Sequence, residues 1–419
     1  MTSSLAVLAL TLAACGGGEP LFELYEPELD TPERLAWDAG IVKYLGTAKP
    51  REERVLDNGD ITYEFDAKDG PQCLRGRPYR TTVRDTESED LLIFLQGGGA
   101  CWSDFCLAVT SAPAGIATGA NLLDADLEAN PYADFDIVYL PYCDGSLFAG
   151  DRDVPEDDPA KIAKGHDTRR YRGLANLSAA LTMSYKHFPR PRRVVLAGSS
   201  GGGYGTILAS YLVRYVYPGV PIEVVNDAGI GLGKEGDQAF LDKLISEFGA
   251  EAFIPDECVG CLEGGHILGL VTYLLERDPD IRVAAISSWF DFVISELFLG
   301  IDPLVFQDAM ATRTQELHER FPDQYRRFIY DGAGHTAVLG NVTGIVGSDL
   351  LGGVELPSEF GTAGFAGLQI LSIDCEPDAT SCIPAQIGDV TLSDWLFAMS
   401  TGDDEGWADL TATPTLPEP

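Results

Sequence analysis

A short apolar strand runs into a glycine-rich turn and the start of a helix in Val194-Val195-Leu196-Ala197-Gly198-Ser199-Ser200-Gly201-Gly202-Gly203-Tyr204. The turn contains the pattern G-x-S-x-G, with Ser200 as its serine. Flanking glycines keep side chains away from such a strained strand-to-helix turn, so the serine oxygen projects above the sheet. Ser200 is therefore a candidate nucleophile, whereas Ser199 is expected to point into the structure. A phosphate-binding loop is the rival interpretation, but neither G-x-G-x-x-G nor G-x-x-x-x-G-K-[ST] occurs here.

Strands and helices alternate along the rest of the chain. Apolar runs bounded by turn residues predict strands at Asp90–Leu95, Phe135–Tyr139, Arg193–Ala197, Ile222–Val225, Arg282–Ile286 and Arg326–Ile329. Longer periodic stretches predict helices at Arg169–His187, Gly203–Tyr215, Gln238–Phe248 and Gln307–Arg320. This alternation predicts an α/β fold with a mostly parallel central sheet and helices on both faces, in a single domain. Ligands of such sheets bind at the carboxyl ends of the strands.

A second glycine run supplies candidate backbone donors for an oxyanion. It lies in Phe94-Leu95-Gln96-Gly97-Gly98-Gly99-Ala100-Cys101-Trp102, directly after a predicted strand and upstream of the elbow. Acyl transfer at a serine needs N–H groups aimed at the developing negative oxygen. Gly98 and Gly99, together with Gly201 after the nucleophile, are the candidates, although glycine runs also mark plain flexible turns.

Three histidines follow the candidate nucleophile and compete for the role of general base. His335 follows a predicted strand and stands on a glycine-rich loop, which is the expected position for a base. His318 lies in a polar helical stretch and is expected to be a surface residue. His266, flanked by Gly264 and Gly265, is the second candidate.

The acid that would orient the base is expected between the nucleophile and the histidine, because hydrolases of this fold use the order Ser, Asp or Glu, His. Asp291 ends the strand that precedes the histidine strand and is the preferred candidate. Asp227, at the end of another predicted strand, is its main competitor. Asp331 is also a candidate, although it lies only four residues before the histidine.

The composition is that of a globular protein with a strongly acidic surface. Of 419 residues, 65 are Asp or Glu and 29 are Lys or Arg, which gives a formal net charge of −36. Such a charge repels phosphate backbones and anionic lipid headgroups, so nucleic acid is not an expected partner. The charge is expected to serve solubility. No cofactor or metal is expected.

The ends of the chain carry signals of their own. The apolar stretch Leu5–Ala14 is too short to span a bilayer and predicts an export signal. Leu12-Ala13-Ala14-Cys15 is similar to a bacterial lipobox, whose cysteine becomes lipid-modified, although no Lys or Arg precedes Leu5. The predicted organisation is a signal peptide at 1–14, a lipidated Cys15 with a tether at 15–35, a catalytic domain at 36–410 and a tail at 411–419. We expect a monomer in the cell envelope or secreted, with membrane contact only through the lipid.

Eight cysteines remain once Cys15 is assigned to lipid. They are Cys73, Cys101, Cys106, Cys143, Cys258, Cys261, Cys375 and Cys382. An even set in an exported chain predicts disulfides, and the sequence alone leaves their pairing open. Proximity favours Cys101 with Cys106 and Cys375 with Cys382, while Cys258-Val-Gly-Cys261 could close a tight loop or form half of a metal site.

With these residues in view, the chain resembles the pectin acetylesterase and Notum family of α/β-hydrolases over roughly Cys73–Trp395. The resemblance rests on Gly198-Ser199-Ser200-Gly201-Gly202, Leu95-Gln96-Gly97-Gly98-Gly99, Trp289-Phe290-Asp291 and Gly334-His335. Further landmarks are Tyr142-Cys143-Asp144-Gly145, Arg172-Gly173-Leu174-Ala175-Asn176 and Asn226-Asp227-Ala228-Gly229. The resemblance implies that Asp227 is structural and that Cys73 bridges to Cys143. Notum has a tryptophan where this chain has Gly99.

The combined prediction is an exported serine carboxylic-ester hydrolase in which Ser200, His335 and Asp291 act together. The family resemblance implies removal of acetyl groups from an acylated polysaccharide, or of a fatty acyl group in the Notum branch. A lipase-type long-chain esterase and a catalytically silent carbohydrate- or protein-binding module are the alternatives.

Overall fold

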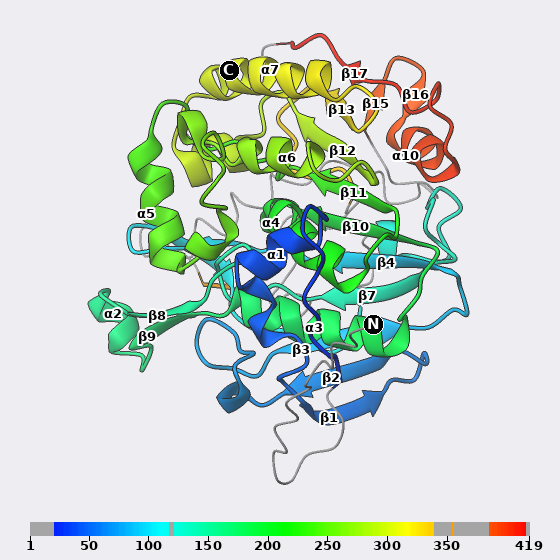
Figure 1. Cartoon of the computed structure of the whole chain (residues 1–419). Helices are drawn as coiled ribbons and strands as arrows, with labels where there is room; N and C mark the ends of the chain where they lie inside the picture. The colour runs from blue at the N-terminus through cyan, green and yellow to red at the C-terminus, as the bar shows by residue number, and fades with distance from the viewer. Residues whose placement is uncertain (1–20, 117–120, 339–353, 356–384, 416–419) are drawn as a thin grey trace, which may run out of the picture.

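One large twisted sheet crosses the molecule (Figure 1). The computed structural model describes residues 21–116, 121–338, 354–355 and 385–415. The ten-stranded sheet has the order β1-β2-β3-β7-β4-β10-β11-β12-β13-β17. The pairs from β7 through β4 to β17 are all parallel, and β1, β2 and β3 extend the sheet with antiparallel pairs. The predicted α/β-hydrolase-like fold, with a mostly parallel sheet in one domain, is confirmed.

The strands of the described residues have the following bounds: β1 Pro50–Val55, β2 Ile61–Phe65, β3 Arg80–Arg84, β4 Asp90–Leu95, β5 Gly99–Cys101, β6 Cys106–Val109, β7 Asp136–Leu140, β8 Arg152–Pro155, β9 Thr168–Tyr171, β10 Arg193–Ser199, β11 Ile222–Asp227, β12 Ile281–Ser288, β13 Tyr325–Tyr330, β14 Val354–Glu355, β15 Gln386–Ile387, β16 Val390–Thr391 and β17 Leu410–Thr411. The α-helices are α1 Arg34–Asp38, α2 Pro159–Ile162, α3 Gly173–His187, α4 Gly201–Val216, α5 Gln238–Phe248, α6 Leu268–Leu275, α7 Pro303–Arg320 and α10 Leu392–Thr401. The described residues also form short 3-10 helices and one π-helix, η6 (Val293–Leu299).

Both faces of the sheet are buried, which explains the near-continuous apolar runs of its central strands. In β10, Val194 and Leu196 pack into the larger apolar cluster, and Val195 and Ala197 into the one on the opposite face. The larger cluster contains side chains from α3, α4, α6 and α7, and the opposite one is covered by α10. Alternate side chains of each strand therefore face different helix layers.

The four predicted helices are found as α3, α4, α5 and α7, with shifted starts in α3, α4 and α7 and an end one residue later in α4, while α1, α2, α6 and α10 were not predicted. Helix α5 has the predicted bounds and is capped by Asp237, whose side chain accepts the Phe240 N–H. Helix α7 begins before the predicted Gln307, because Asp302 caps it and Pro303 occupies its first turn. The prediction of a helix from Arg169 was wrong, since 168–171 form β9, paired with β8, and α3 begins at Gly173.

The packed structure extends beyond the expected domain boundaries at 36 and 410. The Tyr25 ring stacks on Tyr215 of α4 at 4.7 Å between centroids, and their hydroxyl and backbone groups exchange hydrogen bonds. At the other end, β17 pairs with β13, and Trp289 Nε1 donates to Ala412 O. The predicted signal peptide and Cys15 lie outside the described residues.

Three disulfides tie the described part of the chain together. They join Cys73 to Cys143, Cys101 to Cys106, and Cys258 to Cys261. The first is the pairing that the family resemblance implies. The third makes Cys258-Val-Gly-Cys261 a closed loop rather than half of a metal site, and no cluster of metal-ligating side chains occurs among the described residues. The predicted Cys375–Cys382 pair lies outside them.

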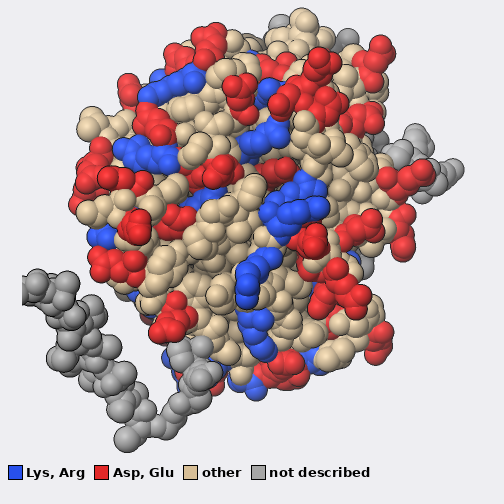
Figure 2. Space-filling model, turned by 45° about the vertical axis from the view of Figure 1, so that its right-hand side comes forward, with Lys and Arg blue, Asp and Glu red and all other residues tan. Residues whose placement is uncertain are grey.

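Acidic side chains spread over the whole face that Figure 2 draws, with basic ones interspersed among them. This distribution agrees with the excess of acidic residues in the sequence. Within the ranges that the structure describes, we find no helix with the length and apolar character needed to cross a membrane.

Candidate active site

Ser200 stands at the carboxyl end of β10, on the turn into α4. Its backbone has φ 56° and ψ −122°, a strained conformation for a residue with a side chain. The Ser200 N–H donates to Asp227 O, which ties the turn to β11. The neighbouring glycines are required by space, because a Cβ on Gly198 would lie 2.4 Å from Gly202 O, and one on Gly202 would lie 2.1 Å from Leu95 O. The strand, turn and helix thus form the sharp elbow that the sequence predicts.

The three residues predicted to act together are joined by hydrogen bonds. His335 Nε2 lies 2.7 Å from Ser200 Oγ, and His335 Nδ1 lies 2.9 and 3.0 Å from the two carboxylate oxygens of Asp291. Asp291 follows β12 and His335 follows β13, so parallel strands of one sheet deliver all three side chains to the edge formed by their carboxyl ends. Asp291 is fully buried and also accepts the Ile294 N–H. The array has the geometry of a nucleophile, a base and an orienting acid.

Two opposing effects act on the imidazole. Burial lowers the pKa of His335, but the charge and hydrogen bonding of Asp291, together with the charge of Asp227, outweigh it and raise the pKa above its usual 6.5. A raised pKa makes the imidazole a better proton acceptor from a serine hydroxyl.

Asp227, the competing acid candidate, holds the histidine loop in place. Its buried carboxylate accepts the Ser199 hydroxyl at 3.0 Å and the backbone N–H groups of Ala337 and Val338 at 3.0 to 3.2 Å. Burial raises the pKa of Asp227 to about 6. Asp227 therefore connects the elbow to the loop that follows His335, in keeping with the structural role implied by the resemblance.

The other competing residues lie away from Ser200. His266 Nδ1 accepts the Gly233 N–H, and its Nε2 faces Glu235 at 2.8 Å, so both ring nitrogens are engaged. His318, in α7, contacts Tyr325 O of β13 through its Nδ1 at 2.8 Å. Asp331 is exposed and accepts the Thr415 N–H.

The predicted oxyanion glycines lie against the elbow. A Cβ on Gly201 would be 2.8 Å from Gly99 O and 3.7 Å from Gly99 N, so β5 runs directly beside the first turn of α4. Gly99 and Gly201 line the same pocket as Ser200. Gly98 faces Tyr142 and Val109 instead, and its carbonyl accepts the Val109 N–H.

An apolar pocket of about 90 Å³ opens beside Ser200. Its walls come mainly from β5 and the turn after it, from the loop after β7, from α5 and from η6. They include Leu147, Leu241, Leu244, Ile294, Phe298 and Leu299. Such walls suit the apolar part of an acyl group, and the serine lies at their edge.

Sequence reasoning missed most of these wall residues. Leu147 and the next residue, Phe148, both have positive φ, at 57° and 63°, and the Leu147 N–H donates to Tyr142 Oη. This conformation turns Leu147 toward Gly201, to within 3.6 Å of its Cβ position. The only sequence signal nearby was the family landmark that begins at Tyr142, since hydrophobic periodicity does not report a side chain on an irregular loop.

Comparison with known proteins identifies a family whose model matches part of the chain. Residues 60–248 match the family model described as Pectinacetylesterase, a range that contains the glycine run and the elbow but ends before Asp291 and His335. No curated protein matches the chain. The family implies a carboxylic-ester hydrolase. The match over residues 60–248 thus confirms the family resemblance that the motifs of the sequence predict.

Proposed function

We propose that this protein is a serine esterase that removes acetyl groups from an acylated polysaccharide. The observation that carries the proposal is the hydrogen-bonded chain from Asp291 through His335 to Ser200, at the edge of an apolar pocket. The family match supports the acetyl ester as the bond that is cleaved.

In the proposed mechanism, Ser200 Oγ attacks the acyl carbon while His335 Nε2 takes its proton. Asp291 orients the imidazole and stabilises its positive charge. The backbone N–H groups of Gly99 and Gly201, with Gly98 as the third candidate, stabilise the negative oxygen. His335 then protonates the leaving alcohol, and a water activated by the same imidazole releases the acid from the serine.

A longer acyl group is the second candidate, and the pocket favours it. A water-sized group needs only about 10–15 Å³ on a comparable measure, and the pocket offers about 90 Å³ beside Ser200. Its wall of leucine, isoleucine and phenylalanine side chains would accept several methylene groups.

The test is hydrolysis of p-nitrophenyl esters from acetate to palmitate by the wild type and by Ser200→Ala. We expect turnover by the wild type and none by the variant, because the variant has no nucleophile. A steep preference for acetate supports the deacetylase, and a preference for long chains supports the second candidate.

Ser199→Ala is the matched control, since the Ser199 hydroxyl contacts Asp227 and not His335. It should still react with a fluorophosphonate probe at Ser200. Unchanged turnover by Ser200→Ala would disprove the proposed nucleophile. A wild type that neither hydrolyses esters nor takes up the probe would favour a binding module.

A further inference from the structure

Two walls of the apolar pocket come from segments that are distant in sequence. Helix α5 contributes Phe240 and Leu244, and β5 with the following turn contributes Gly99 and Trp102. The Trp102 and Phe240 rings meet edge to face at 5.9 Å between centroids. The width of the pocket therefore depends on what holds α5 against the turn.

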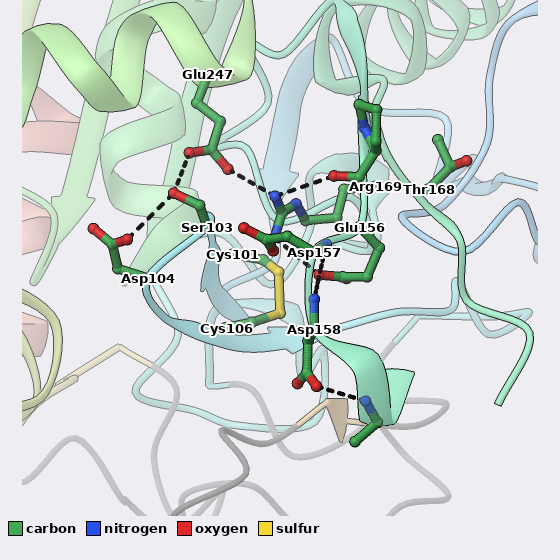
Figure 3. A network of polar contacts seen from close by, with 12 residues as sticks. Cys101, Ser103, Asp104, Cys106, Glu156, Asp157, Asp158, Thr168, Arg169 and Glu247 are labelled. Atoms are coloured by element: carbon green, nitrogen blue, oxygen red, sulfur yellow. Dashed lines mark hydrogen bonds and ion pairs between the residues drawn. A yellow bond between two sulfur atoms is a disulfide. The ribbon is translucent and has the colours of Figure 1, made fainter. Parts of the chain in front are cut away.

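Glu247, near the end of α5, forms the polar connection between these walls (Figure 3). Its carboxylate accepts the Ser103 hydroxyl at 2.8 Å, within the turn, and the Tyr171 hydroxyl at 3.1 Å, in β9. Arg169 Nη2 lies 3.6 Å from the same carboxylate. The Glu247 side chain is only 11% exposed, so these contacts are shielded from water.

Arg169 is itself fixed by a buried network. Its Nη1 lies 3.1 Å from Glu156, and Glu156 accepts Arg75 Nη2 at 2.7 Å. Each of these three side chains is at most 5% exposed. Because removal of one partner leaves a buried charge unpaired, the network resists displacement of Glu247.

Further contacts lead from Glu247 to β5, the strand that carries Gly99 and is called the oxyanion strand here. The Tyr171 hydroxyl also contacts Cys101 O at 2.8 Å, at the end of β5. The Cys101–Cys106 disulfide and hydrogen bonds between Trp102 and Phe105 close the turn. Gly99 lies two residues before Cys101 and directly beside Gly201. A shift of the turn would therefore move a candidate oxyanion donor relative to Ser200.

We infer that Glu247 is a positioning residue, which fixes the oxyanion strand and the pocket wall relative to the nucleophile through Ser103, Tyr171 and Arg169. The inference rests on the proposed function. Glu247 lines no part of the pocket itself, so it acts only through the residues that it holds.

The test measures kcat and KM of Glu247→Gln with p-nitrophenyl acetate, per active site titrated with a fluorophosphonate. We expect kcat per titrated site to fall about tenfold, because a misplacement of about 1 Å can lower a rate about 100-fold. KM should change less than twofold, as for a loss confined to the transition state. A merely structural role would lower the number of titrated sites and leave kcat per site unchanged, which would overturn the inference.

Asp104→Asn is the matched control. Asp104 pairs with Lys243 and so links the same turn to the same helix, but both side chains are exposed, at 70% and 43%. An exposed pair contributes little, so kcat should stay within twofold of the wild type. An effect as large as that of Glu247→Gln would contradict the role of the buried contact.

Ser103→Ala provides a second test if Glu247→Gln does not fold. It removes the hydrogen bond to Glu247 and the 3.5 Å contact with Asp104, and it leaves Arg169 paired. We expect a smaller fall in kcat per titrated site than in Glu247→Gln. Where Glu247→Gln does fold, the double variant should lose less than the sum of the two single effects, because both substitutions remove the hydrogen bond between Ser103 and Glu247. An unchanged kcat per titrated site in Ser103→Ala would overturn the inference. A wild type that is not titrated at all would instead contradict the proposed function.

Discussion

At the scale of single residues, two buried carboxylates of the site, Asp291 and Asp227, make different contacts. Asp291 contacts the imidazole of His335, whereas Asp227 accepts backbone N–H groups of the loop that follows it. One carboxylate therefore contacts the imidazole directly and the other fixes the loop that follows it, and the charges of Asp291 and Asp227 both raise the pKa of His335. Ser200, with its positive φ, is placed by the same interaction network, because its N–H donates to the Asp227 carbonyl.

The raised pKa of His335 has a measurable consequence for pH dependence. A general base must be neutral, so kcat/KM should rise with pH through the pKa of His335 and reach half its maximum above pH 6.5. In Asp291→Asn the main charge that raises this pKa is gone, so the residual activity should have its midpoint at lower pH. The measurement is the pH profile of kcat/KM with p-nitrophenyl acetate. A wild-type midpoint below 6.5, or the same midpoint in both proteins, would contradict this assignment.

At the scale of elements, α4 begins with three glycines although glycine is a poor helix former. Alanine is favoured over glycine by about 1 kcal/mol in a helix interior. The need for close contact outweighs this preference for alanine at the start of α4, because the helix begins directly against the backbone of β4 and of the turn after β11. A Cβ on Gly203 would lie 2.8 Å from Asp227 O. The glycines thus allow helix and sheet to meet where Ser200 stands.

Gly202→Ala should therefore destabilise the protein, against the helix preference. Its Cβ would lie 2.1 Å from Leu95 O, so β4 and α4 must separate, and we expect a loss of about 1–3 kcal/mol in the free energy of unfolding. Denaturant unfolding measures the loss, and ester turnover should fall with it. Gly260→Ala, at an exposed position where a Cβ would approach only Glu263 Oε2 at 3.7 Å, is the control and should keep both stability and full turnover. A Gly202→Ala protein as stable as the wild type would show that this contact relaxes freely.

At the scale of the whole molecule, charge and covalent bonds fit an exported protein. The net charge of −36 makes copies of the chain repel one another. Three disulfides in the described ranges are typical of an oxidising compartment. Export and lipidation at Cys15 remain predictions, because residues 1–20 lie outside the described part of the chain.

The same charge predicts a salt dependence that differs between substrates. Pectin is a polyanion and should be repelled at low ionic strength, where the Debye length is about 30 Å at 0.01 M, and less at 0.15 M, where it is about 8 Å. Deacetylation of acetylated pectin should therefore speed up with added NaCl, while hydrolysis of neutral p-nitrophenyl acetate should not. Acetate release at both salt concentrations tests this. Equal salt responses for acetylated pectin and p-nitrophenyl acetate would indicate that the surface charge does not affect how pectin approaches the active site.

Local patterns were sufficient to predict the central part of the fold. The β4 and α5 bounds, the elbow at Ser200 and the positions of Asp291 and His335 after consecutive strands all follow from periodicity, turn residues and chain order. These features are encoded locally, because buried parallel strands need continuous apolar runs and a tight elbow needs glycine. The antiparallel strands β1 to β3 were not predicted, since their mixed polar sequences carry no such run.

Other features depend on residues that meet only after folding. Asp227 ends β11 and Asp291 lies just after β12, the neighbouring strand, and loop geometry decides which of them reaches His335. The pocket walls and the contacts of Glu247 join β5, β9 and α5, and their residues are more than 60 positions apart in sequence. No local pattern reports such contacts, because they depend on how the helices and hairpins pack around the sheet. The chain order of its side chains thus predicts the chemistry of this site, while packing sets its shape.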